Sequence, residues 1–362
     1  MSATKELVEQ ALAGFTDPNT GKNLQAAKAI REVKLNGTTA EIDLLMPYPC
    51  NGIHDQMRAE ITPLVTALEG IDTVNLNIST RIIAHSVQHG VKRMENVKNI
   101  IAVASGKGGV GKSTTSVNLA LALSHEGAKV GLLDADIYGP SQPRMMGLSG
   151  QPESSDGKSI EPMRNYGIET MSIGFLIDEE TPMIWRGPMV TQALEQLLND
   201  TNWSDLDYLV IDLPPGTGDT QLTLAQKVPV SGAVIVTTPQ DIALLDARKG
   251  LKMFEKVEVP ILGIVENMST HVCSECGHEE PIFGQGGGLQ MAEDYNINLL
   301  GSLPLDISIR RQVDGGKPTV VNDPDGAISL RYREIARKTS AALANQAKDY
   351  SASFPNIVIQ ST

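Results

Sequence analysis

Cysteine is scarce in this sequence, with only Cys50, Cys273 and Cys276 among 362 residues. An odd and sparse set of cysteines argues against the disulfide framework of a small secreted domain. The hydrophobic content of 41% is instead enough to build real cores, and the chain is long enough for two domains. Any role of the cysteines would therefore come from individual thiols and not from disulfide bonds. Two of them, Cys273 and Cys276, lie three positions apart.

Long apolar runs and blocks of basic residues are also lacking. No apolar run approaches the ~20 residues that cross a bilayer, and the N-terminus is too charged for a secretory signal. The formal net charge is -13 and the sequence pI about 5.0, without a basic block to neutralise nucleic-acid phosphates. We therefore expect a cytoplasmic globular protein that binds neither a membrane nor nucleic acid.

Residues 1–80 predict a small α+β domain. Apolar spacing predicts helices over 4–15 and 55–68, and period-two alternation predicts strands over 29–35, 40–45 and 73–78. The dipeptide Asn36-Gly37 between the first two strands is a strong hairpin signal. This α-β-β-α-β order, with the D-P-x-T-G turn at residues 17–21 and Cys50 in a loop, resembles the small domain of iron-sulfur assembly proteins. Cys50 is either an accessory thiol or a small structural residue.

The chain after this domain predicts a larger α/β unit. Residues 81–98 have little apolar periodicity and are expected to be a linker, and 346–362 are expected to be a C-terminal tail in which Pro355 interrupts any helix. In between, residues 99–345 alternate strands and helices, which is typical of a mostly parallel sheet flanked by helices. We expect strands over 99–104, 129–136, 208–213, 232–239 and 261–268, and helices over 116–126, 187–199 and 241–256. Residues 140–165, rich in Pro, Gly and Ser, are expected to form a surface excursion.

A phosphate-binding loop follows the first of these strands. Residues 105–115 read S-G-K-G-G-V-G-K-S-T-T and fit G-x-x-x-x-G-K-[ST] between a buried strand and a helix. Its glycines let successive N–H groups wrap an anion at the positive end of the helix. Lys112 is expected to reach the β/γ-phosphates and the Ser113 hydroxyl to take a place on Mg²⁺. The residues expected to bind ATP here are Gly106, Lys107, Gly108, Gly109, Val110, Gly111, Lys112, Ser113 and Thr114.

Acidic residues end two further strands at the edge of the sheet where ligands bind. Asp134 and Asp136 end one strand, so both are expected to lie near the phosphates. Asp212 ends another in a Walker B pattern and is expected to hold Mg²⁺, while the Gly216 N–H is expected to meet the γ-phosphate. A helix N-cap role for the first two aspartates is disfavoured because Tyr138-Gly139-Pro140 does not continue as a helix.

Lys107 is a second lysine inside the loop, where phosphate oxygens would balance its charge. The run K-G-G-V-G-K-S-T therefore resembles the deviant Walker A class, whose members hold nucleotide between two subunits. The resemblance implies that Lys107 acts catalytically on the partner's phosphates and that Asp136 positions or activates the attacking water. It also implies that Asp134 lies near the metal and that Asn267 reads the adenine edge. A solvated loop lysine and an ordinary turn asparagine are the alternatives.

A second chemical centre is the pair Cys273 and Cys276, in a loop that breaks the strand and helix alternation. Two thiolates at i and i+3 supply half of the four ligands that a [4Fe-4S] cluster or a structural zinc usually takes. The rest could come from His271 and His278 or from the same cysteines of a second subunit. The two-fold dimer implied by Lys107 favours the second source, and with it a bridging [4Fe-4S] cluster. The alternatives are, in order, a structural zinc knuckle, a redox dithiol and an inert buried pair.

Four motifs together carry a more specific resemblance. They are G-K-G-G-V-G-K-S-T, D-A-D-I-Y-G-P-S, D-L-P-P-G-T-G-D, and E-N-M-S with C-x-x-C a few residues later. This set resembles the Mrp/ApbC family of iron-sulfur cluster carrier ATPases over nearly the whole chain. The segment Trp185-Arg186 also matches that family, and Trp185 is expected to pack against the start of the helix that follows.

This resemblance implies a homodimeric, slow, Mg²⁺-dependent ATPase with a cluster at Cys273 and Cys276. Its partners would be apo iron-sulfur proteins, which receive the cluster, and cluster scaffold proteins. A spatial regulator of the ParA or MinD type and a cluster-dependent reductase are the alternative functions.

Overall fold

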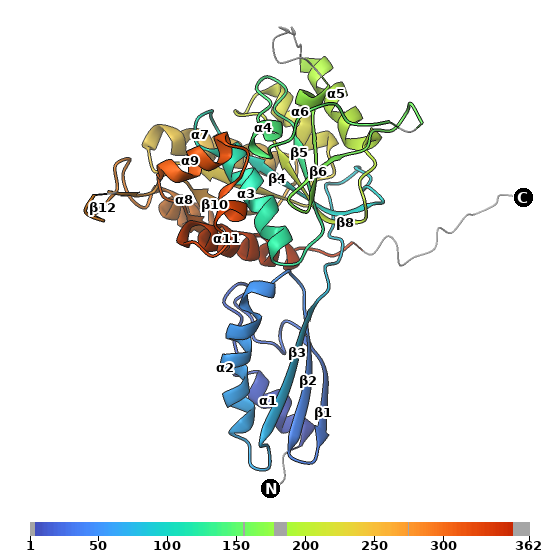
Figure 1. The fold of residues 1–362 in the computed structure, drawn as a ribbon, viewed down its shortest axis with the longest axis vertical. Coiled ribbons are helices and arrows are strands. Elements are labelled where there is room, and N and C mark those ends of the chain that lie inside the picture. The colour runs from blue at the N-terminus through green and yellow to red at the C-terminus, as the bar shows by residue number, and fades with distance from the viewer. Residues whose placement is uncertain (1–3, 155, 177–186, 274, 350–362) are drawn as a thin grey trace, which may run out of the picture.

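The structure is a computed structural model that describes residues 4–154, 156–176, 187–273 and 275–349. Figure 1 shows two bodies along the long axis, a small one with three strands and a larger one built on an eight-stranded sheet. Trp185, Arg186 and Pro355 lie outside the described residues. In the part of the chain that is described, no helix combines the length and apolarity needed to cross a membrane.

The small body is a three-stranded sheet packed against two helices. Strand β1 (Ile30–Asn36) pairs antiparallel with β2 (Thr39–Met46), which pairs in parallel with β3 (Thr73–Thr80). Helix α1 (Lys5–Leu12) and helix α2 (His54–Thr66), which follows the short turn η1 (Asn51–Ile53), bury their apolar faces on this sheet. The observed elements match the predicted α-β-β-α-β order and hairpin. Between the hairpin strands, Gly37 has a φ of 62°, which glycine adopts without strain.

The larger sheet has the strand order β13-β10-β9-β4-β8-β5-β7-β6. Every neighbouring pair is parallel except β6 and β7, which are antiparallel. The strands are β4 (Val97–Ala104), β5 (Val130–Asp134), β6 (Met163–Asn165), β7 (Ile168–Ser172), β8 (Leu206–Asp212), β9 (Gly232–Thr237), β10 (Ile261–Glu266) and β13 (Leu299–Ser302). The predicted α/β fold with a mostly parallel sheet is confirmed.

Helices cover both faces of this sheet because its central strands are buried on both sides. Along β4, Ile100 and Ala102 belong to one core, whereas Ile101 and Val103 belong to the other. The first core is closed by α5 (Gly187–Asp200), α6 (Asp219–Lys227), α7 (Asp241–Lys256) and α8 (Gly287–Tyr295). The second is closed by α3 (Lys112–His125), α9 (Ile307–Asp314), α10 (Thr319–Asn322) and α11 (Ala327–Ala344).

Two loops hold more regular structure than the sequence indicated. The expected excursion over 140–165 contributes α4 (Gln142–Met145) and the edge strand β6, and Gln142 and Met146 are fully buried. The loop with the paired cysteines contains a short hairpin, β11 (His271–Val272) and β12 (Glu279–Glu280). The expectation of a surface excursion over 140–165 is wrong for the buried residues of α4, because tertiary contacts order a segment with weak local propensity. The cysteine loop does lie outside the strand and helix alternation, as expected.

The segment predicted as a linker, 81–98, packs onto the larger body. The backbone N–H of buried His85 donates to Asn99 Oδ1 at 3.0 Å. The amide of buried Gln88 donates to the carbonyls of Ala225 and Val228 at 2.6 and 2.7 Å. These contacts attach the chain to the larger body before β4 begins.

A buried ionic cluster joins the two bodies at the C-terminal end of α3. Glu126, which is fully buried, accepts from Arg333 Nε at 2.8 Å and from Arg337 Nη1 at 2.7 Å, both on α11. Its second oxygen accepts from the Gly52 N–H of the small body at 2.8 Å. Glycine fits there because a Cβ on residue 52 would collide with the Arg333 guanidinium and the Glu126 carboxylate, and would displace the ion pair. The far end of the helix that follows the phosphate loop is thus tied to the small body.

Replacing Glu126 with alanine should lower the free energy of unfolding by about 3–5 kcal/mol, because the nearly buried Arg337 guanidinium loses its carboxylate partner and that of Arg333 keeps only a 3.7 Å contact with exposed Asp325. Urea denaturation of the full chain measures the change. The matched control is Glu255→Ala, since Glu255 pairs with Lys252 on the surface, where such pairs contribute ~0–1 kcal/mol. Equal losses in the two variants would contradict the structural role of the cluster.

Candidate functional site

The phosphate-binding loop connects β4 to α3, as the motif predicts. Gly111 precedes α3 with a φ of 83°, in the left-handed region. A Cβ on Gly111 would collide with the Asn267 amide, and one on Gly106 with the backbone of Asp246. Glycine at these two positions therefore lets neighbouring elements close around the loop.

Lys112 and Asp212 form a buried ion pair beneath this loop. Lys112 Nζ lies 2.6 Å from Asp212 Oδ1, and the two side chains are 6% and 0% exposed. The Ser116 hydroxyl donates to the same oxygen at 2.9 Å, and Gln142 Nε2 donates to Oδ2 at 2.9 Å. Lys112 Nζ also donates to the Ser113 hydroxyl at 3.2 Å. The structure thus brings together the lysine, serine and aspartate that the sequence assigns to Mg-ATP.

Gln142 is a site residue that sequence reasoning missed. It reaches Asp212 from α4, inside the segment expected to be an excursion, and its Nε2 also donates to the Ser113 carbonyl at 3.1 Å. A glutamine in a stretch rich in Pro, Gly and Ser carries no local signal for this contact. The only sequence signal is that it directly follows the D-I-Y-G-P-S motif.

Asp134 serves as a buried anchor for the loop that follows β5. Its carboxylate accepts from the N–H groups of Asp136, Ser141 and Gln142 at 3.0 to 3.1 Å. Burial and the neighbouring Asp212 charge raise the pKa of Asp134 to about 7. Neither aspartate is a helix N-cap, as the sequence argument expected, because the N-cap of α4 is Ser141; Asp134 contacts the start of that helix from the end of β5.

Asp136 is half-buried at the same edge of the sheet. Burial raises the pKa of its carboxyl group, and the positive charge of Lys112 opposes this shift. The negative charge of Asp212 also raises it. Asp136 therefore shares one electrostatic environment with the Lys112 and Asp212 pair.

Two predicted nucleotide contacts have other hydrogen-bond partners. The Gly216 N–H, expected to meet the γ-phosphate, donates to the Ser105 carbonyl at 3.0 Å, so the structure does not direct it at the loop's anion site. Asn267 Nδ2, expected to read a base edge, donates to the Val110 carbonyl at 2.9 Å. Asn267 thereby joins the end of β10 to the phosphate loop.

Lys107 is half-exposed on the outer part of the loop. Its carbonyl accepts from the Ser105 hydroxyl at 2.9 Å, which holds the backbone. No carboxylate among the described residues lies within ion-pair distance of its ammonium group. In contrast to buried Lys112, Lys107 is therefore accessible to a group outside its own site.

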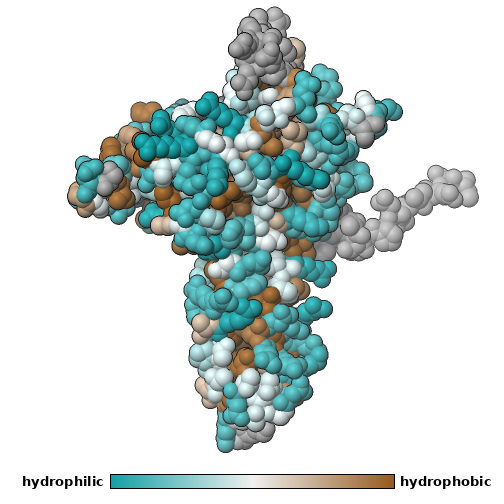
Figure 2. Space-filling view, in the orientation of Figure 1, coloured by the Kyte–Doolittle hydropathy of each residue, from teal (hydrophilic) through white to brown (hydrophobic). Residues whose placement is uncertain are grey.

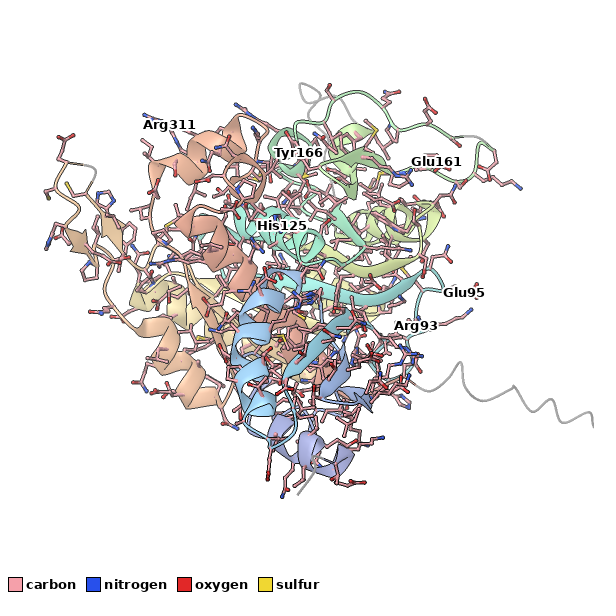
Figure 3. The ribbon with its side chains drawn as sticks, turned by 60° about the horizontal axis from the view of Figure 1, so that its bottom comes forward. Arg93, Glu95, His125, Glu161, Tyr166 and Arg311 are labelled. Atoms are coloured by element: carbon pink, nitrogen blue, oxygen red, sulfur yellow. The ribbon has the colours of Figure 1, made fainter. Side chains whose placement is uncertain are left out.

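Cys273 and Cys276 lie at the tip of the β11–β12 hairpin. Figure 1 shows this hairpin projecting from the larger body, and Figure 3 shows it standing clear of the sheet from a second direction. The Cys273 N–H donates to the His278 carbonyl at 2.9 Å, and the Gly277 N–H donates back to the Cys273 carbonyl at 2.8 Å. Gly277 has a φ of 70°, so this tight turn favours glycine.

The two thiols are free and accessible, Cys276 being exposed and Cys273 partly so. Backbone N–H groups of Cys276 and Glu275 directed at the sulfur lower the pKa of Cys273, which favours the thiolate that binds metals. The reading of an inert buried pair is therefore wrong. Within the described ranges, no group of three or more His, Cys, Asp or Glu residues is arranged to hold a metal. The donor set that the pair itself offers is two thiolates, which fits half of a four-cysteine cluster site.

Cys50 lies elsewhere and has a different character. It is fully buried in the core of the small body, where burial above all raises the pKa of its thiol to about 12. A protonated, inaccessible thiol is a poor nucleophile and a poor metal ligand. Of the two readings of Cys50, the structural residue is supported.

Exposed apolar side chains gather on the elements around the hairpin. Figure 2 shows apolar residues at the end of the larger body that carries it. We call the following set the hairpin patch: Ile242, Leu245, Val272, Ile282, Leu289 and Ile307, each 44% to 65% exposed. Exposed apolar groups concentrated in one region indicate an interaction surface.

Comparison with known proteins agrees with the geometry. Residues 96–340 match the family model described as NUBPL iron-transfer P-loop NTPase, and residues 5–78 match that of iron-sulfur cluster assembly proteins. The iron-sulfur cluster carrier protein of Escherichia coli strain K12 is 50% identical over 94% of this chain and 93% of its own. The iron-sulfur cluster transfer protein NUBPL of Mus musculus is 54% identical over 68% of this chain and 77% of its own.

One solved structure is also similar to the larger body. It is the nucleotide-binding protein of Archaeoglobus fulgidus in complex with ADP, which is 39% identical with a TM-score of 0.57. The match covers 65% of this chain and 91% of that one.

Proposed function

This chain belongs to the family of NUBPL iron-transfer P-loop NTPases, and we propose that it is an ATP-hydrolysing carrier of iron-sulfur clusters. Relatives about 50% identical over most of the chain are named iron-sulfur cluster carrier proteins, which supports an iron-sulfur cluster as the cargo. The phosphate loop of this chain and the ADP bound in the Archaeoglobus fulgidus structure support the binding of an adenine nucleotide. All three cysteines are free, which suits the reducing cytoplasm.

The observation that carries this proposal is the accessible cysteine pair on a hairpin rooted beside the phosphate loop. Two thiolates are half of the ligands of a [4Fe-4S] cluster, and a two-fold dimer brings two such pairs to one axis. The hairpin patch supports a partner surface at this place. We infer that the cluster bridges Cys273 and Cys276 of two chains and passes from there to apo-proteins.

Mg-ATP would be organised by the buried group under the loop. For Lys112 to reach the β/γ-phosphates, its ion pair with Asp212 must be exchanged for phosphate contacts. That exchange frees Asp212 to hold Mg²⁺ together with the Ser113 hydroxyl. Asp136 then positions the attacking water, and its raised pKa suits a group that accepts a proton.

The same contacts suggest how the two centres communicate. The Asn267 amide is bonded to the Val110 carbonyl, and β11 begins at His271, four residues later. The root of the hairpin is fixed by the Leu305 N–H, which donates to the Thr270 carbonyl at 2.7 Å. We propose that a change in the loop on nucleotide binding is passed through Asn267 to the cysteines.

Cluster transfer to a [4Fe-4S] dehydratase stripped of its cluster tests the function. The anaerobically reconstituted carrier, with an iron chelator present, should reactivate the dehydratase faster than the same amounts of free iron and sulfide. The chelator captures iron in solution but not a cluster that passes directly between proteins. Equal reactivation by carrier and free ions would contradict the carrier function.

A further inference from the structure

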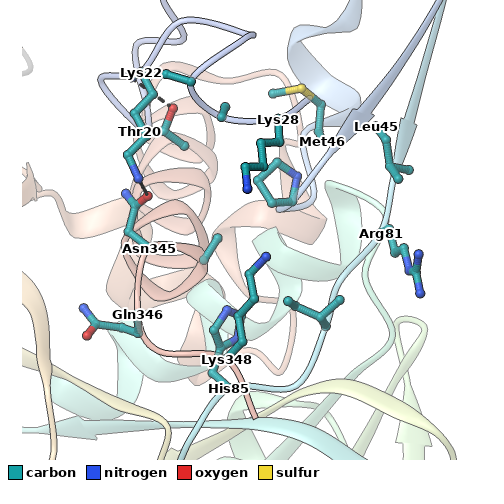
Figure 4. Close-up of a pocket in the computed structure, with 15 residues that line it drawn as sticks. Thr20, Lys22, Lys28, Leu45, Met46, Arg81, His85, Asn345, Gln346 and Lys348 are labelled. Carbon is teal, nitrogen blue, oxygen red and sulfur yellow. Dashed lines mark hydrogen bonds between the residues drawn. The ribbon is translucent and has the colours of Figure 1, made fainter. Parts of the chain in front are cut away.

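A cavity of about 420 Å³ lies where the small body meets the larger one. As Figure 4 shows, its walls come from four separate segments: residues 20–28, 45–47, 81–85 and 344–348. A volume of this size is in the range of small-molecule sites, ~300–1,000 Å³. The cavity lies apart from the phosphate loop and the cysteine hairpin, neither of which contributes to its lining.

The lining of this junction pocket is basic, although the protein as a whole carries a net charge of -13. Lys22, Lys28, Arg81 and Lys348 line it, and none of its fifteen lining residues is acidic. In Figure 4, Lys28 and Lys348 extend from opposite walls, so that both ammonium groups point into the space between them. Among the described residues, no carboxylate lies at ion-pair distance from any of the four cations. Lys22 Nζ donates to Asn345 Oδ1 at 2.6 Å, so the charges that face the open space and are available to an anion are those of Lys28 and Lys348.

His85 adds a buried, directional group to this pocket. The residue is 2% exposed, and its Nδ1 lies 2.9 Å from Asn99 Oδ1. The Asn99 amide is oriented because its Nδ2 donates to the Ile83 carbonyl at 2.9 Å, so its oxygen accepts and His85 Nδ1 carries the hydrogen. The other ring nitrogen, Nε2, is buried without a hydrogen-bond partner. A buried polar atom of this kind favours a ligand that supplies its missing hydrogen bond.

The hydrogen-bonding role of the His85 ring limits which ligands fit the pocket. Burial first, and the Lys348 charge among the weaker causes, lower the pKa of His85, which disfavours the protonated ring. With the hydrogen on Nδ1, Nε2 is a hydrogen-bond acceptor. A ligand that satisfies both Nε2 and the lysines must carry a negative charge and also a hydrogen-bond donor, for which an O–H group is suited. Hydroxylated phosphate esters and hydroxycarboxylates have this combination.

We propose that the junction pocket binds a small hydroxylated anion through Lys28, Lys348 and the Nε2 atom of His85. Because the walls come from both bodies, the bound anion would bridge them and favour one arrangement of the small body relative to the ATPase. This binding site is separate from the nucleotide and cluster sites and does not depend on the function proposed for them.

Isothermal titration calorimetry on the full chain tests the proposal, with Mg-ADP added in excess to saturate the phosphate loop. The probes are fructose 1,6-bisphosphate and citrate, titrated separately. At least one should bind once per chain, and Lys28→Gln with Lys348→Gln should weaken it roughly tenfold or more, as two charge-assisted contacts are lost. If only fructose 1,6-bisphosphate binds, the anionic group that the pocket recognises is a phosphate; if only citrate binds, it is a carboxylate.

The matched control is Lys158→Gln with Lys256→Gln, which removes the same charge from exposed positions outside the pocket. This variant should bind as the unsubstituted chain does, and the ¹⁵N resonance of His85 Nε2 should shift when the probe is added. Failure of both probes to bind, or equal weakening in the two double variants, would overturn the proposal.

Discussion

Lys107→Gln should lower the rate of Mg-ATP hydrolysis by about 10³-fold or more, the scale of effect of a cation supplied to a transferring phosphoryl group. Lys112 is buried and paired with Asp212 inside its own site, whereas Lys107 is half-exposed and has no carboxylate partner among the described residues. If Lys107 acts on the phosphates of the partner chain, its loss should reduce kcat and leave nucleotide affinity largely unchanged. Steady-state hydrolysis and ADP binding measure the two effects.

Mixed dimers test whether Lys107 acts across the interface. Lys107→Gln and Lys112→Gln are each expected to be inactive alone. When the two are mixed equally, each heterodimer contains one site with an intact Lys112 and an intact Lys107 from the partner. Half of the dimers are mixed, so about a quarter of the original activity should return. No recovery, in a mixture shown to exchange subunits, would count against action in trans.

Cys273→Ala combined with Cys276→Ala should abolish cluster binding, which is the other large effect expected. The two thiols are the accessible ones, and backbone N–H groups favour the thiolate of Cys273. After anaerobic reconstitution, the double variant should hold only background iron and acid-labile sulfide and lack the visible sulfide-to-iron absorption. Both contents are measured per chain.

The matched control is Cys50→Ala, because that thiol is buried in the small body and its pKa is raised to about 12. This variant should bind as much iron and sulfide as the unsubstituted protein. Sulfide analysis also separates the cluster from a zinc knuckle, since zinc brings no inorganic sulfide. A double variant with undiminished iron and sulfide would contradict the assignment of Cys273 and Cys276.

The regular elements of the fold could be predicted because their signals are local. The buried strands β4, β8 and β9 are continuous apolar runs, and α7 follows its predicted limits of 241 and 256. The hairpin β11–β12 could not be predicted, because two strands of two residues carry no periodicity. Its order comes from contacts of residues 269–271 with Leu303 and Leu305 and from the turn at Gly277.

The site was predictable to the extent that its chemistry lies in contiguous motifs. Lys112, Ser113 and Asp212 do come together, although 100 residues separate the lysine from the aspartate. Gln142 and the Asp134 anchor depend on how the loop after β5 folds back, which composition does not reveal. The roles of individual residues toward nucleotide and cluster stay predictions.

The two alternative functions are not equally compatible with the comparisons. The matched family model is that of iron-transfer NTPases, and the relatives at about 50% identity carry carrier names, so a spatial regulator of the ParA or MinD type is not supported. A cluster-dependent reductase would use the same cysteine pair and differs only in passing electrons instead of the cluster. The transfer assay distinguishes the two, because a reductase does not lose its iron to the acceptor.

The bridging cluster is tested most directly by measuring molar mass together with iron and sulfide content on the same anaerobically reconstituted sample. Light scattering coupled to size-exclusion chromatography gives the mass of the species that carries the absorption of the cluster. A [4Fe-4S] cluster held by two cysteine pairs predicts a dimer with about two iron and two sulfide ions per chain. A cluster absorption that elutes at the mass of one chain, or about four iron ions per chain, would contradict the bridging site.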